Sequence, residues 1–214
     1  MHLPSDATPA DPHLVTGEDA LAELYAKPLG PSLHKVADHL TATYRAMLEA
    51  SPFCVLATVG PEGMDCSPRG DEHGLVQVRD ERTLLLPDRR GNNRLDSLRN
   101  IVRDGRVALL FLVPGANETL RVNGRAVVSA DPALCARFEV DGKAPRTVVV
   151  ITVEAVYFQC ARALVRSRLW DPARHVPRAA LPTAGAMLAE ASGGREGGEE
   201  YDRALPARQA ATLY

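Results

Sequence analysis

The segment Pro87–Arg94, with the sequence PDRRGNNR, holds the densest group of side chains that could bind an anion. It carries three arginines, one glycine and two asparagines between an apolar strand-like run and an amphipathic helical pattern. The first turn of a helix offers free backbone N–H groups and a positive dipole end. Arginine adds charge-assisted, often bidentate hydrogen bonds to phosphate oxygens. The segment therefore predicts a phosphate-monoester site, although a basic turn before a capped helix explains the same residues equally well.

The segment Cys66–Gly74, CSPRGDEHG, could contribute to the same site. Ser67 and Arg69 offer a hydroxyl and a guanidinium for an anion, and Asp71 could orient Arg69 or accept from a ligand N–H. A polar turn between two strands is the favoured alternative for this segment taken alone. His73, in the same polar loop, is the only histidine whose position would suit a ligand.

Two more segments carry arginines beside possible binding surfaces. Arg121 lies on the strand face opposite Leu120 and Val122, where it could bind the polar edge of a ligand or face water. The run RALVRSRLWDP at 162–172 contains the only tryptophan, Trp170. A single tryptophan is more often part of a core or an interface than a stacking platform for a ligand.

Protein nucleophiles and metal motifs are not evident in the sequence. HExxH, GxSxG, GxxxxGK[ST] and GxGxxG do not occur, and the four cysteines are scattered without a CxxC pair. Any demanding chemistry would then be carried by a cofactor. Scattered cysteines and a polar, proline-rich start that does not resemble a signal peptide predict a cytoplasmic protein.

The composition limits the range of partners. The chain has 214 residues, of which 45% are hydrophobic and 24% charged, so it can build an ordinary globular core. Lys+Arg 25 against Asp+Glu 27 gives a net charge of −2, which argues against a nucleic-acid partner. No run approaches the roughly 18 apolar residues that a membrane helix needs, so no membrane partner is expected.

The elements that must position these residues are mostly strands. Between residues 53 and 160, six or seven short apolar or alternating runs are joined by connections too short for crossover helices, which predicts an antiparallel barrel or sandwich. Helices are predicted at about 18–26, 33–50, 93–103 and 131–138, and Ser192–Glu200 (SGGREGGEE) is expected to be a flexible spacer. The predicted organisation is an N-terminal arm and helix at 1–32, a barrel domain at 33–172, and a C-terminal helix and flexible tail of that domain at 173–214.

Taken in chain order, six motifs form a specific set: SPFCVLAT, SPRGD, LLLPDRRGNNRLDSLRNI, VALLFLVPG, ETLRVNGRA and RSRLWDP. The set resembles the pyridoxamine 5′-phosphate oxidase-like, FMN-binding split-barrel family, and within it a bacterial subgroup. The likeness covers about residues 33–172, and YDRALPARQAATLY at 201–214 is similar to that subgroup's tail. The resemblance implies a mainly β protein with flanking helices, built on a six-stranded antiparallel split β-barrel. It also implies a homodimer with FMN at the interface.

The resemblance assigns expected roles to individual residues. Ser67 and Arg69 fall on the strand that runs along the flavin, and Asn93 and Arg94 fall where the family has its phosphate-binding Arg-Lys pair. Arg90 could supply the charge that Asn93 lacks. Pro87 and Asp88 match the strand end beside the flavin, and Arg166, Ser167 and Trp170 match a segment that reaches it from the partner subunit. The predicted cofactor-binding set is Ser67, Arg69, Gly70, Asp71, Pro87, Asp88, Arg90, Asn93, Arg94, Arg121, Arg166, Ser167 and Trp170.

The expected function is that of an FMN-dependent oxidoreductase acting on a small molecule, with that molecule or a nicotinamide as reductant. No catalytic side chain is predicted, because FMN itself carries out hydride transfer. The alternatives are a flavin store or redox sensor without catalysis, and a split-barrel protein that binds haem or a deazaflavin. The cations Arg69, Arg90 and Arg94 favour a phosphorylated ligand over haem, for which His73 is the only candidate axial ligand.

Overall fold

The structure, a computed structural model, describes residue 11 and residues 13–72 and 74–214. Contacts divide the chain into two units, residues 1–35 and 36–214. The first contains two short helices, α1 (Glu18–Leu24) and α2 (Gly30–His34), neither of which has a buried residue. All of the predicted site residues lie in the second unit. The predicted limits at residues 32 and 172 stay predictions.

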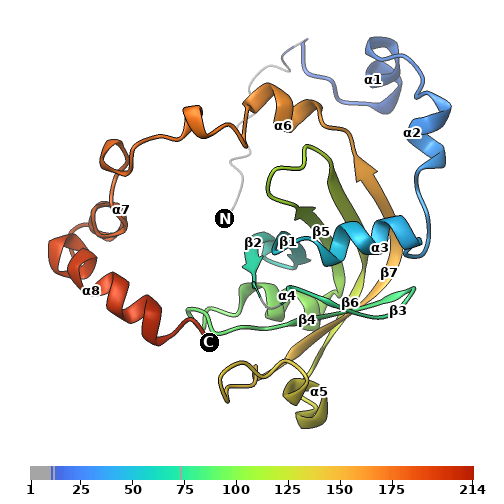
Figure 1. The fold of residues 1–214 in the computed structure, drawn as a ribbon. Helices are drawn as coiled ribbons and strands as arrows, with labels where there is room; N and C mark the ends of the chain where they lie inside the picture. Colours follow the sequence, from blue (N-terminus) through green and yellow to red (C-terminus); the bar gives the residue numbers. More distant parts are fainter. Residues whose placement is uncertain (1–10, 12, 73) are drawn as a thin grey trace. The chain divides into compact units, whose positions relative to one another are not determined.

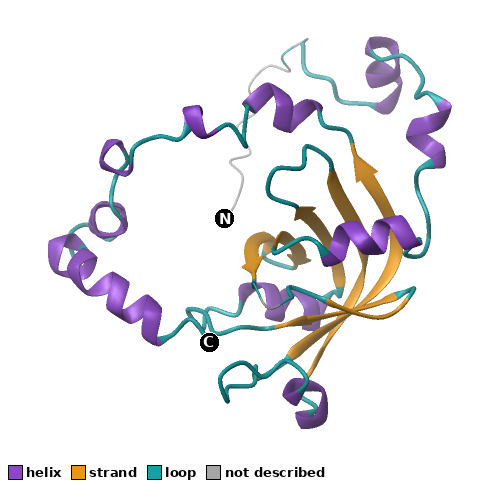
Figure 2. Ribbon diagram, viewed as in Figure 1, coloured by secondary structure: helices purple, strands orange, loops and turns teal. Residues whose placement is uncertain are grey.

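A single antiparallel sheet forms the centre of the second unit (Figures 1 and 2). Its strand order is β2-β1-β5-β6-β7-β4-β3, and every pair of neighbours is antiparallel. The strands are β1 (Phe53–Gly60), β2 (Gly63–Gly70), β3 (Gln77–Asp80), β4 (Thr83–Pro87), β5 (Arg106–Leu112), β6 (Thr119–Ser129) and β7 (Val148–Gln159). The predicted mainly β fold with an antiparallel sheet and flanking helices is confirmed. The sheet has seven strands where the resemblance implied six, because the short β3 pairs with β4 at one edge.

Strand alternation separates the two faces of the sheet. Because paired residues point to the same side, the register across five strands defines an inner row and a neighbouring outer row. The inner row is Ser67, Leu56, Leu109, Val122 and Val156. The outer row is Pro68, Val55, Leu110, Arg121 and Tyr157. All four apolar residues of the inner row are buried, whereas the outer row is half-exposed or exposed, so the core lies on the inner side.

Six further helices belong to the described residues of the second unit. They are α3 (Ala42–Glu49), α4 (Asp96–Arg103), α5 (Pro132–Ala136), α6 (Arg162–Ser167), α7 (Ala184–Ala191) and α8 (Gly198–Ala211), with the 3-10 turns Pro172–Arg174 and Arg178–Ala180. Of these helices, α3 and α4 pack against the sheet. Helix α4 packs against β1, β2 and β6. No helix in the described part of the chain is long and apolar enough to span a membrane.

Two predicted helices are shorter than expected, each for a local reason. The pattern at 33–50 gives α3 only from Ala42, because Ala37 forms a bridge with Val156 of β7 instead of continuing a helix. The pattern at 93–103 begins at Asp96, because Asn93 and Leu95 have φ values of 59° and 62° in the left-handed region.

The expected flexible spacer at 192–200 is a defined connection. Ser192 Oγ accepts a hydrogen bond from the Glu196 N–H at 3.0 Å, and α8 begins at Gly198. Gly197 has a φ of 98°, and an added Cβ would lie 2.4 Å from the carbonyl oxygen of Gly185. The glycines here permit a tight α7–α8 turn and do not make a loose linker. The structure thus gives this segment a defined turn where the sequence predicted a flexible spacer.

Candidate functional site

Four polar side chains form one hydrogen-bonded group where β2 meets α4. Asp65, Ser67 and Arg69 alternate along β2 and therefore share the inner face, and Ser97 lies in the first turn of α4. Ser67 and Ser97 both donate to Oδ2 of Asp65, at 3.0 and 2.6 Å, and Arg69 donates to Ser97 Oγ at 3.1 Å. We call these four residues the β2–α4 cluster. The network fastens the start of α4 to the edge strand of the sheet.

Arg69 is the main cation of this cluster. Its side chain is half-buried, and its other hydrogen bond goes to the carbonyl oxygen of Pro68 at 2.9 Å. Within the described ranges, no carboxylate lies at ion-pair distance from its guanidinium. A half-buried guanidinium whose charge is not cancelled by a contacting carboxylate has residual capacity to bind an anion.

Asp88 lies within the electrostatic reach of Arg69. Its N–H donates to the carbonyl oxygen of Thr147 at 3.0 Å, which fixes the residue directly after β4. Burial raises the pKa of the Asp88 carboxyl, and the nearby Arg69 opposes that rise. The hydroxyl of Thr147 is buried and has no hydrogen-bond partner within the described part of the chain. A polar ligand at this strand end would find a hydroxyl with unused bonding capacity.

Replacing Asp88 with Asn is expected to stabilise the protein at neutral pH. A raised carboxyl pKa means that ionisation costs stability, so stability falls as pH rises from the ordinary Asp pKa through the raised one. Allowing for the part of the side chain that water still screens, we expect a gain of roughly half a kcal/mol, or about 1–2 °C in Tm. The gain should disappear below about pH 4, where both states hold the proton.

Thermal unfolding followed by circular dichroism at pH 7 and pH 3.5 measures this effect. Asp104→Asn is the matched control, because hydrogen bonds from Arg106 lower the pKa of the Asp104 carboxyl to about 2. That variant should lose stability at pH 7. If Asp88→Asn instead lowers the Tm at pH 7, ionisation of Asp88 does not destabilise the folded protein, and the prediction is contradicted.

The remaining predicted phosphate ligands lie on the exposed part of the loop at 88–95. Arg90 is exposed and has neither a hydrogen bond nor an ion pair among the described residues. Arg94 pairs with Asp96 at 2.7 Å and keeps 73% of its side chain exposed. Asn93 is exposed and holds the left-handed conformation that turns the loop toward α4. These residues surround the start of α4, but the single chain leaves them open to solvent.

Asp71 has a partner that the sequence did not predict. It was expected to orient Arg69 or to accept from a ligand N–H, and its Oδ2 lies 2.7 Å from Nε of Arg89, the residue directly after Asp88. The Asp71 side chain is 1% exposed and that of Arg89 is 15% exposed. The hydroxyl of Tyr214 also donates to Asp71, at 3.2 Å. Of the arginines in PDRRGNNR, Arg89 is thus structural, which leaves Arg90 and Arg94 for an anion.

The structure fixes Gly70 and Pro87 at strand ends. Gly70 closes β2 opposite Phe53, and Pro87 closes β4 opposite Val148. Pro87 is buried and Gly70 is exposed. Both residues lie at the edge of the candidate site, where they contribute backbone atoms but no side-chain hydrogen-bond donor.

Arg121 lies on the other side of the sheet from Ser67 and Arg69. It belongs to the outer row, and its guanidinium donates to the hydroxyl of Tyr157 at 3.1 Å. The predicted alternation with the buried Leu120 is confirmed. Arg121 and the β2–α4 cluster therefore face opposite sides of the sheet, and one ligand cannot contact both of them within a single chain.

Trp170 is held against the β5–β6 loop. Its indole N–H donates to the carbonyl oxygen of Ala116 at 2.6 Å. Arg166 is exposed on α6, and the Ser167 hydroxyl donates to the carbonyl oxygen of Leu164. None of the hydrogen bonds of Arg166, Ser167 and Trp170 in the described ranges reaches Ser67 or Arg69. Their expected role toward a partner subunit stays a prediction.

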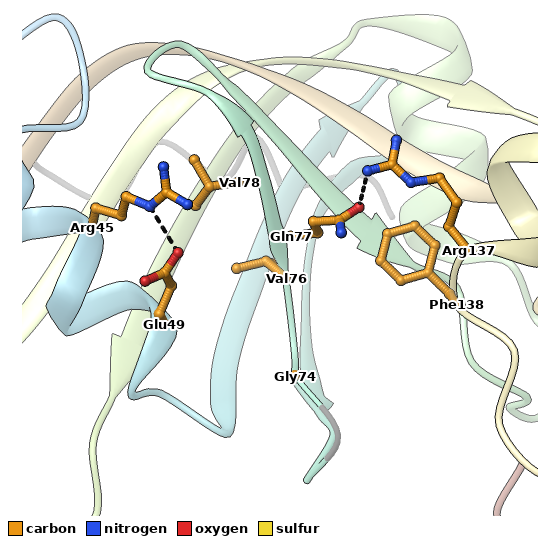
Figure 3. A pocket seen from close by; sticks show the side chains of 8 residues that line it. All are labelled: Arg45, Glu49, Gly74, Val76, Gln77, Val78, Arg137 and Phe138. Atoms are coloured by element: carbon orange, nitrogen blue, oxygen red, sulfur yellow. Dashed lines mark hydrogen bonds and ion pairs between the residues drawn. The ribbon is translucent and has the colours of Figure 1, made fainter.

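A separate hollow of about 360 Å³ lies between α3, β3 and the end of α5 (Figure 3). Its described lining residues are Arg45, Glu49, Gly74, Val76, Gln77, Val78, Arg137 and Phe138, none of which was predicted as a site residue. Figure 3 shows Arg45 bonded to Glu49 and Arg137 bonded to Gln77, at 2.8 and 2.5 Å. Both arginines are thus engaged, and this hollow is a weaker anion site than the β2–α4 cluster. His73, the candidate haem ligand, lies outside the described residues.

Several site residues escaped prediction from the sequence. Asp65 could have been found, because it lies two residues before Ser67 on an alternating strand. Ser97, Arg89 and Tyr214 could not, since their contacts join segments 18 to 143 residues apart. No local pattern marks such pairs.

Together the fold and the cluster define a mainly β protein with a hydrogen-bonded polar cluster at the junction of a strand and a helix. The chain belongs to the pyridoxamine 5′-phosphate oxidase family, since residues 40–160 match the sequence model of that family. This confirms the resemblance seen in the motifs. No curated protein matches the chain.

Solved structures of similar fold cover about half of the chain. HupZ from Group A Streptococcus is 17% identical, with 56% of this chain and 93% of that chain covered and a TM-score of 0.46. An FMN-binding protein from Syntrophomonas wolfei is 12% identical, with 54% and 88% covered and a TM-score of 0.41. A structure named F420 reductase is 22% identical, with 56% and 98% covered and a TM-score of 0.40. Likenesses of this degree carry no conclusion about function.

Proposed function

We propose that the chain binds FMN at the β2–α4 cluster and the loop at 88–95, and uses it as an oxidoreductase of a small molecule. The observation that carries the proposal is Arg69, a half-buried guanidinium that is fixed by Ser97 at the start of α4 and has no contacting carboxylate within the described ranges. Membership of the pyridoxamine 5′-phosphate oxidase family supports the same cofactor class.

The donor set fits the chemistry of FMN. Its phosphate is an anion that needs several cationic or N–H donors, and Arg69, Arg90 and Arg94 with the first turn of α4 offer them. The buried Thr147 hydroxyl offers a further polar contact near Asp88. FMN, when bound, would accept and pass on a hydride, so this chain needs no nucleophile of its own. Its residues would bind the phosphate, orient the ring and exclude water.

A homodimer is part of this proposal. The outer sheet face carries the half-exposed Val55, Ala57 and Leu110 beside Phe53, which is 37% exposed, and Met64, which is 82% exposed. A second copy covering this apolar face would remove it from water. It would also allow Arg121 and the segment with Trp170 to serve the site of the other subunit. The four free cysteines suit a reducing compartment such as the cytoplasm.

The experiment is a visible absorption spectrum of the purified protein, chromatography of the ligand released on denaturation, and anaerobic mixing with NADH or NADPH. FMN release near one per chain and bleaching of the flavin band by a nicotinamide support the oxidoreductase. Bound FMN that no reductant bleaches would favour a flavin store. A colourless protein that takes up haem or a deazaflavin, but not FMN, would overturn the proposal.

A further inference from the structure

Arg89 joins four segments of the chain at one buried point. It follows Asp88 in the loop that leaves β4, and its Nε contacts Asp71 at the end of β2. Its Nη1 donates to the carbonyl oxygen of Phe138, just after α5, at 2.5 Å. The ring of Tyr214 lies 5.2 Å from its guanidinium carbon, within cation–π range. The guanidinium is thus held by a carboxylate, a carbonyl and an aromatic face.

Tyr214 connects the last helix to this point. Helix α8 ends at Ala211, and Tyr214 then donates its hydroxyl to Oδ1 of Asp71 at 3.2 Å. Figure 1 shows the chain after α8 returning to the neighbourhood of the loop that follows β4. Burial and the neighbouring Asp71 carboxylate raise the pKa of the Tyr214 hydroxyl, so it keeps its proton and remains a donor.

The loop at 88–95 depends on this anchoring. Arg90 is exposed and has no hydrogen-bonding or ion-pair partner among the described residues, and Asn93 and Leu95 adopt backbone conformations that are unfavourable for non-glycine residues. Within the loop the Arg94 N–H donates to Asn92 Oδ1 at 3.1 Å, and contacts from other segments add to this local order. A binding loop that is already ordered loses less entropy when its ligand arrives.

We propose that Tyr214 and Arg89 are positioning residues for the phosphate-binding loop, so that docking of the segment after α8 sets the affinity of the site for a phosphorylated flavin. The inference rests on the proposed function. Neither residue touches the cofactor in this account. Each acts by holding the loop at 88–95 against the end of β2.

The test compares wild type with Tyr214→Ala, Tyr214→Phe and Leu213→Ala. Leu213 is 65% exposed and adjacent in sequence, so its variant is the matched control. Amide hydrogen exchange of the peptide spanning 86–98, measured without flavin, reports loop order. Fluorescence titration with FMN reports affinity. Tyr214→Ala should speed exchange and weaken FMN binding, each by about 3–10-fold, because it removes one hydrogen bond to a carboxylate and one cation–π contact.

The conservative variant separates positioning from general damage. Tyr214→Phe keeps the ring over Arg89 but loses the hydroxyl that donates to Asp71, so its protection and affinity should lie between those of Tyr214→Ala and wild type, and Leu213→Ala should match wild type in both. Unchanged exchange and unchanged affinity in Tyr214→Ala would overturn the inference. Faster exchange with unchanged FMN affinity would show that Tyr214 orders the loop, and would overturn the claim that this order sets the affinity for FMN. Wild-type protein that does not bind FMN would overturn the proposed function, while the exchange experiment would still report whether Tyr214 orders the loop.

Discussion

Arg69→Ala is expected to lower the affinity for FMN by about 100-fold. The variant loses the half-buried cation that Ser97 fixes beside the start of α4. Hydrogen bonds to charged groups contribute roughly 1.5–3 kcal/mol each, and the loss of about 3 kcal/mol corresponds to about two orders of magnitude in Kd.

Flavin fluorescence titration of the apoprotein measures this change. Arg106→Ala is the matched control, because Arg106 is an exposed arginine whose Nε pairs with Asp104 at 2.7 Å. It should bind FMN like wild type. Arg94→Ala should also lower affinity, but by less, because Arg94 is already paired with Asp96 and largely exposed. Unchanged flavin content in both the Arg69 and the Arg94 variants would contradict the site, though not the fold.

Arg89→Ala is expected to destabilise the protein by about 3 kcal/mol. Asp71 would keep a side chain that is 1% exposed and lose its ion-pair partner. Breaking a buried pair by removing one partner typically costs 3–5 kcal/mol, because a charge is left buried without compensation. The carbonyl of Phe138 also loses its donor. For a chain of this size the change corresponds to a drop in Tm of about 6–12 °C.

Urea unfolding of Arg89→Ala, Asp71→Asn and the double variant measures the pair. The double variant should be more stable than the sum of the two single effects predicts, with a coupling of about 1–3 kcal/mol, since removing both partners leaves no isolated charge. Arg103→Ala is a suitable control, because Arg103 pairs with Glu62 at an exposed site. A loss below about 1 kcal/mol for Arg89→Ala would contradict the buried ion pair.

The sequence predicted those parts of the fold that depend on local patterns. Alternation in LRVNG placed the buried Leu120 and Val122 on one face of the strand and Arg121 on the other. Short connections implied antiparallel pairing, and the helix predicted at 131–138 is present as α5, whose N-cap is Asp131. Ser67 and Arg69 were identified together, and the structure brings them into one cluster.

The parts that escaped prediction depend on contacts between distant segments. Asp71 was expected to orient the neighbouring Arg69 or to accept from a ligand N–H, yet the fold brings Arg89 to it from 18 residues away. Ser192–Glu200 was expected to be flexible because of its glycines, although positive φ values at Gly197 and Gly198 build a turn between two packed helices. The glycine content of a segment indicates that its backbone can adopt unusual conformations. It does not show whether contacts with other segments hold the backbone in one of them.

The most direct test of the account is calorimetric titration of flavin-free protein with FMN and, in parallel, with riboflavin. The central claim is that arginines at the junction of β2 and α4 recognise a phosphorylated flavin. It predicts one FMN per chain and at least about 100-fold tighter binding of FMN than of riboflavin, since only FMN carries the phosphate. Equal affinity for the two flavins, or no binding of either, would contradict it.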